Sequence, residues 1–149
     1  VDEQVIFLQK EDQWVHNILA IPHDRIQQLH IEIHETMNCA KFGLKTATIA
    51  TACTAVETAC LIGIDFRCGK SIKDVSTDLG IKNRELYMPD YLSFLEKNGI
   101  ITEKTTIYGK ALNLIRRTAT HSKTGYVKEY TTAFVVDAFK DIINEIIGV

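Results

Sequence analysis

The sequence predicts an all-α protein, and three observations carry that prediction. Apolar residues recur at three- and four-residue spacing over most of the 149 residues, which is the periodicity of helices that bury one face. Residues 46–62 form a run that is apolar on all sides and rich in alanine, which is typical of a helix at the centre of a helical domain. Residues that start and stop helices separate these periodic segments.

Three helices are expected in the first part of the chain. Apolar residues between 5 and 19 predict a first helix that ends before Pro22. Asp24 followed by Gln27 resembles a capping box and is expected to open the second helix. The third is the run 46–62, whose five threonines favour a strand but whose length and alanines favour a helix.

Two short helices around Gly80 have the pattern of a helix-turn-helix. Ser71 begins a capping box at the start of the first helix, and Gly80 supplies the left-handed residue that ends it. Asn83 is expected to cap the second helix, which Gly99 closes. Pro89 would kink that second helix unless the helix begins near Pro89 itself.

The carboxy-terminal part is expected to contain two more helices. Residues 100–102 and 105–107 are rich in isoleucine and threonine and predict short extended pieces. A sixth helix is expected at about 108–121 and a seventh at 131–147. The seventh has a broad apolar face, which either packs back on the preceding helices or waits for a partner chain.

The net charge of −2 hides an uneven distribution along the chain. Residues 1–66 hold nine acidic and four basic side chains, a balance of −5. Residues 67–128 hold six acidic and twelve basic side chains, a balance of +6, and residues 129–149 hold four against one, a balance of −3. The basic block contains the helix-turn-helix pattern, so it favours contact with a phosphate backbone; a solvated surface is the alternative.

Residues 3–99 resemble one repeat of the cyclin and transcription factor IIB-like superfamily. The resemblance lies in the alanine-rich helix that ends in Ala59-Cys60, in residues 71–75 (Ser-Ile-Lys-Asp-Val) and in residues 80–86 (Gly-Ile-Lys-Asn-Arg-Glu-Leu). The nearest members are the repeats of transcription factor IIB and the sixth subunit of the origin recognition complex.

The resemblance implies a cyclin-like five-helix repeat with two additional C-terminal helices. Residues 1–102 would be the repeat that contains the helix-turn-helix, and residues 103–149 a helical extension or incomplete second repeat packed on it. It also implies a DNA-contacting or scaffold module of an initiation complex, in transcription or at a replication origin. DNA and other subunits of that complex are the expected partners, and the nucleus is the expected location in a eukaryote.

In a helix-turn-helix the start of the second helix reaches base edges and surrounding side chains hold phosphates. Asparagine and arginine suit the first role because each makes paired hydrogen bonds to a base. The expected DNA-binding residues are Lys70, Lys73, Lys82, Asn83, Arg84 and Lys97, and a second basic patch comprises Arg116, Arg117 and Lys123.

No enzyme motif is visible, so neither catalysis nor a cofactor is expected. His30 and His34 lie four residues apart and can face one metal ion, but no third ligand is evident, so no metal site is predicted. The four cysteines lack Cys-x-x-Cys spacing and are expected to be free thiols, with Cys53 and Cys60 buried. These features favour an intracellular protein with no membrane partner.

Two alternatives remain open. One is a winged-helix regulator, in which residues 71–107 form the helix-turn-helix and the wing, with residues 100–107 as the hairpin of the wing. The other is a scaffold subunit that binds no DNA and is held in a larger assembly by its apolar last helix.

Overall fold

Helices make up all the regular structure in the described part of the chain, residues 22–121 and 129–147 of a computed structural model. The all-α prediction is therefore confirmed for these residues, whereas the helix expected at 5–19 lies outside them. The elements are α2 (His23–Lys41), α3 (Lys45–Ile62), the π-helical turn η1 (Gly63–Arg67), α4 (Ile72–Leu79), α5 (Met88–Lys97), α6 (Glu103–His121) and α7 (Glu129–Ile147).

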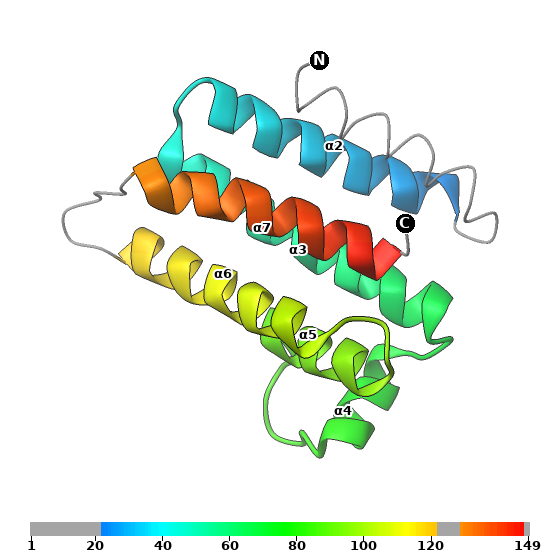
Figure 1. Cartoon of the computed structure of the whole chain (residues 1–149). Coiled ribbons are helices and arrows are strands. Elements are labelled where there is room, and N and C mark those ends of the chain that lie inside the picture. Colours follow the sequence, from blue (N-terminus) through cyan, green and yellow to red (C-terminus); the bar gives the residue numbers. More distant parts are fainter. Residues whose placement is uncertain (1–21, 122–128, 148–149) are drawn as a thin grey trace.

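Helix α3 lies at the centre of the fold and contacts α2, α5, α6 and α7 (Figure 1). Three of its alanines, Ala52, Ala55 and Ala59, are completely buried. Because the distance between packed helices depends on the side chains at the contact, these small residues allow several neighbours to approach α3 at once. The predicted helix of small residues is thus confirmed, with bounds within a residue of those expected.

Three of the five threonines of α3 are compatible with a helix because their hydroxyls donate to backbone carbonyls four residues earlier. Thr48 donates to the carbonyl of Leu44 at 2.7 Å, and Thr54 donates to that of Ala50 at 3.0 Å. A hydroxyl bonded to the carbonyl four residues earlier is satisfied without leaving the helix, which matters most at the buried Thr48.

Helix α7 packs against α3 through its apolar face, which includes the fully buried Phe139, Ile142 and Ile146. Its C-terminal end is held by Arg67 of η1, whose guanidinium donates at 3.0 Å to the carbonyls of Glu145 and Ile146. The last carbonyls of a helix have no partner within it, so a cation placed there both completes their hydrogen bonds and complements the helix dipole.

The same end of α7 also holds the start of α6. The Glu145 carboxylate accepts from the backbone N–H of Thr102 at 2.6 Å and from the hydroxyl of Thr105. A carboxylate beside the first turn of a helix satisfies unpaired donors and complements the positive end of the dipole. α6 and α7 are therefore joined by polar contacts as well as by packing.

Three predictions about helix starts and strands are wrong. α2 begins at His23 after Pro22, with no side-chain cap, so Asp24 lies inside its first turn. Residues 105–107 belong to α6, and residues 100–102 form no strand. The Thr102 hydroxyl accepts from the N–H of Thr105 at 3.3 Å, so threonines that suggest a strand instead begin a helix.

Two of the four free cysteines are buried on α3, as predicted. The Cys53 thiol donates to the carbonyl of Leu112 at 3.5 Å, and its burial raises its pKa to about 11. Burial also raises the pKa of Cys60 far above its usual range. Both thiols are thus held protonated and inert at neutral pH.

One segment of the described residues, Lys45–Arg67, is long and apolar enough to cross a membrane by length and composition alone. Of its most apolar window, 61% is buried inside the fold. Its apolar character is therefore explained by its place at the centre of the helices.

An Ala59→Arg substitution tests the central position of α3. It should lower the free energy of unfolding by more than about 3 kcal/mol, because it places an unpaired charge in a packed core. Thr54→Arg, at an exposed position of the same helix, is the matched control and should change stability by less than about 1 kcal/mol. Equal midpoints for both variants in urea denaturation would contradict the assignment.

Candidate nucleic-acid interface

Helix α4 is attached to the fold by one side and exposes the rest of its surface. Val75 is its one buried residue, and Ile72 remains 43% exposed. Its start matches the prediction: Ser71 accepts from the N–H of Asp74 at 3.2 Å, and the Asp74 carboxylate accepts from the N–H of Ser71 at 2.8 Å. Its end also matches, because Gly80 adopts the left-handed conformation with φ of 69°.

The connection between α4 and α5 differs from the predicted helix-turn-helix. It spans residues 80–87, whereas such motifs use a turn of about three or four residues. α5 begins at Met88, so Asn83 does not cap it. Pro89 lies in the first turn, where its missing N–H costs no helical hydrogen bond. The alternative in which this helix begins near Pro89 is therefore confirmed.

Arg84 is fixed by Asp90 within this connection. Its two terminal nitrogens donate to the two carboxylate oxygens at 2.7 and 2.8 Å, and its guanidinium lies 5.0 Å from the centre of the Tyr87 ring. Asp90 also accepts from the N–H of Tyr87 at 3.0 Å and so caps α5. The hydrogen bonds from Arg84, followed by that from Tyr87, hold the pKa of Asp90 below its usual range despite burial.

The expected place of Arg84 in the first turn of a recognition helix is therefore wrong. The two guanidinium nitrogens that would donate to a base edge already donate to the two carboxylate oxygens of Asp90. The role of Asp90 was not predicted from the sequence. Asp90 lies three residues after Tyr87, but this spacing is a weak capping signal because tyrosine is not a usual cap residue.

The other predicted side chains are arranged around α4 and the connection. Lys70, Lys73, Lys82 and Asn83 are exposed, and no side-chain hydrogen bond to them is present among the described residues. Lys70 and Lys73 lie close enough to Asp74 to help lower its pKa, after the larger effect of its hydrogen bonds with Ser71. Lys97 instead joins α5 to α4 by donating to the carbonyl of Asp78 at 3.3 Å.

A shallow hollow of about 450 Å³ lies in the connection itself and is lined by residues 80–84. Lys82, Asn83 and Arg84 are the lining residues with polar side chains. Lys82 and Asn83 can donate to an anion there, whereas the Arg84 guanidinium is already paired with the Asp90 carboxylate. We refer to residues 70–87, which comprise α4, the two residues before it and the connection after it, as the α4 lobe.

The second predicted basic patch lies elsewhere, on the C-terminal half of α6. Arg117 is exposed, whereas Arg116 is partly buried and donates to the side-chain oxygen of Asn113 at 2.8 Å. Lys123 lies outside the described residues. Because α6 runs away from α4, the two basic patches occupy different ends of the molecule (Figure 1).

Comparisons with known protein families, with curated proteins and with solved structures found no match. The functional proposal therefore rests on the geometry and charge of the surface. Within the described residues, the α4 lobe is the part where most of the predicted DNA-binding side chains come together.

The pairing of Arg84 with Asp90 predicts a pH-dependent contribution to stability. The pKa of Asp90 is lower in the fold than in the unfolded chain, so its stabilisation is present above about pH 4 and is lost as pH falls through the folded value. Asp90→Asn should cost about 1–2 kcal/mol at pH 7 and progressively less below pH 4.

Asp78→Asn is the charge-matched control, because Asp78 is exposed near the C-terminal end of α4. It should leave the free energy of unfolding almost unchanged at pH 7. Urea denaturation between pH 3 and 7 measures both variants. A constant difference between the Asp90 variant and the parent across that range would contradict the assigned role of the carboxylate.

Proposed function

We propose that this chain is a DNA-contacting helical module of a nucleoprotein initiation complex, acting in transcription or at a replication origin. The observation that carries the proposal is the α4 lobe, which projects from the packed core. It carries a shallow hollow and the exposed side chains of Lys70, Lys73, Lys82 and Asn83. Exposed cations on a rigid support are what a phosphate backbone requires.

The arrangement of helices supports the cyclin-like part of the proposal. The features that support it are a central α3 rich in small residues, α2 and α5 packed against α3, and α4 packed against α5. In this interpretation α6 and α7 are the two additional C-terminal helices, and they pack on α3 as well.

The proposed contact is with phosphates more than with bases. Arg84 is engaged by Asp90, and the long connection places Lys82 and Asn83 in a loop instead of on a helix that enters the major groove. Phosphate contacts fix orientation without reading sequence and release counterions. Binding should therefore be sensitive to salt and only weakly dependent on DNA sequence.

A scaffold subunit that binds no DNA is the second candidate. Phe42 and Leu44, between α2 and α3, are 71% and 53% exposed, which is unusual for large apolar side chains and favours a protein contact. The winged-helix alternative has less support, because residues 103–107 are helical and no hairpin forms at 100–107.

Charge reversal at the α4 lobe tests the proposal. Lys73→Glu combined with Lys82→Glu should weaken binding to a long duplex by at least about tenfold at low salt, whatever its sequence, because two phosphate contacts become repulsive. The parent should also lose affinity steeply as salt rises. Fluorescence anisotropy with a labelled duplex measures both effects.

Lys41→Glu combined with Lys45→Glu is the matched control, because it makes the same change in net charge where α2 joins α3. This control should bind DNA within about threefold of the parent, since only distant charge has changed. If both double variants weaken DNA binding equally, binding depends only on net charge, which would contradict the proposal. No binding by the parent at low salt would favour the scaffold candidate.

A further inference from the structure

Tyr87 is an exposed aromatic side chain at the end of the α4 lobe. Tyr87, Tyr91 and Phe94 follow one another at helical spacing, a pattern that is typical of three residues on one buried face. In the structure Tyr91 is 7% exposed and Phe94 is fully buried, whereas Tyr87 precedes the first residue of α5 and remains 44% exposed. The core therefore takes up two of these rings and leaves the third at the surface.

The Tyr87 ring is held in place through the Asp90 carboxylate. The backbone N–H of Tyr87 donates to Asp90 at 3.0 Å, and the Arg84 guanidinium, which lies over the ring at 5.0 Å, is fixed by the same carboxylate. A guanidinium over an aromatic ring is attracted to the ring electrons and stabilises this arrangement. A ring that is anchored before a ligand arrives loses little conformational entropy on binding.

Arg84 also connects the Tyr87 ring to the basic part of the lobe. Arg84 lines the hollow of residues 80–84 and lies over the ring, so the ring and the hollow are adjacent. Lys82 and Asn83 line the same hollow and are exposed. The lobe thus presents a flat aromatic surface next to side chains that can donate to phosphates.

We propose that the Tyr87 ring stacks on an unpaired base of single-stranded DNA whose phosphates contact the cations of the α4 lobe. The inference rests on the proposed function and narrows its ligand to DNA that contains unpaired bases. In a duplex each base is covered by its neighbours in the stack, so proteins reach base edges and the backbone. A single strand exposes the flat faces, and proteins hold such strands with aromatic rings beside a positively charged surface. Every base has such a face, so the contact should tolerate any sequence.

Fluorescence anisotropy at low salt, with the full chain and three labelled probes, tests the proposal. The probes are oligothymidine of about 12 nucleotides, a strand of the same length without bases, and a duplex. The parent should bind oligothymidine at least about fivefold more tightly than the abasic strand, because only oligothymidine can stack. Tyr87→Ala should remove this difference and leave the affinities for the abasic strand and the duplex within about twofold of the parent. Tyr87→Phe keeps the ring and should bind as the parent does.

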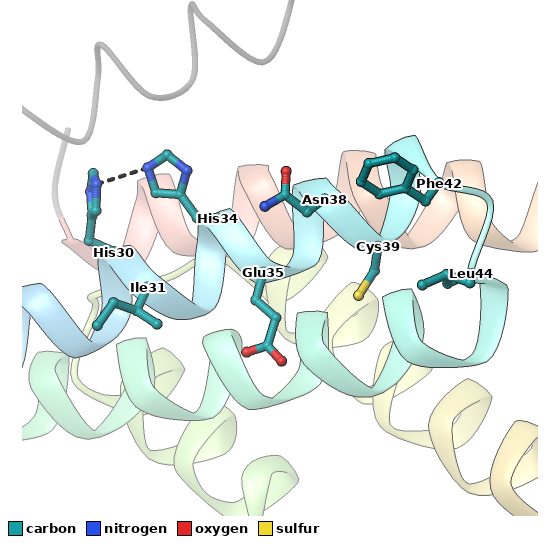
Figure 2. A pocket seen from close by; sticks show the side chains of 8 residues that line it. All are labelled: His30, Ile31, His34, Glu35, Asn38, Cys39, Phe42 and Leu44. Carbon is teal, nitrogen blue, oxygen red and sulfur yellow. Dashed lines mark hydrogen bonds between the residues drawn. The ribbon is translucent and has the colours of Figure 1, made fainter.

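Phe42→Ala is the matched control, because it removes an exposed aromatic ring from another part of the molecule. Phe42 is 71% exposed and lines a hollow of about 510 Å³ on α2 that His30 and His34 also line (Figure 2). It lies where α2 joins α3, at the opposite end of α3 from α4 (Figure 1). The variant should bind all three probes within about twofold of the parent, since distant sites act independently.

Equal affinities of the parent for oligothymidine and the abasic strand would overturn the inference. A Tyr87→Ala variant that keeps the difference, or a Phe42→Ala variant that loses it, would overturn it as well. In each of these cases, duplex binding that depends on Lys73 and Lys82 would leave the proposed function standing. Failure of the parent to bind any of the probes would contradict the proposed function and this inference together.

Discussion

Close packing around α3 is the constraint on which the rest of the structure depends. Its alanines leave room for helices on several sides, and Gly109 of α6 and Gly63 of η1 add further close approaches. A methyl group on Gly63 would meet Ile146 of α7 at 2.7 Å, and one on Gly109 would meet Leu92 of α5. Small residues thus determine where five elements meet, and α4 is left as a projecting lobe.

Local signals explain why much of this fold could be predicted from the sequence. The small-residue run, the capping box at Ser71 and the left-handed Gly80 each involve residues within a few positions of one another. Such signals fix an element before any tertiary contact is known. The strand predicted at Thr102 is wrong, because a threonine that favours a strand is equally a good N-cap and only the following helix decides between them.

The candidate sites were less predictable because distant or competing partners create them. Arg67 reaches carbonyls 78 and 79 residues away, so no local pattern marks it as a helix cap. Arg84 looks like a base reader until Asp90 is placed beside it, and that pairing follows from α5 starting at Met88 instead of at Asn83. The lysines of the α4 lobe were identified correctly as exposed cations, although the connection that carries them is longer than expected.

Nuclear magnetic resonance with an isotope-labelled chain and a duplex at low salt tests the central claim most directly. The account predicts that amide shifts change at residues 70–84 and stay constant along the core positions of α3 and α7, because DNA meets the α4 lobe and leaves the packing intact. Changes centred on Arg116 and Arg117, or on the hollow beside His30 and His34, would contradict the claim. A spectrum unaffected by DNA would contradict it as well.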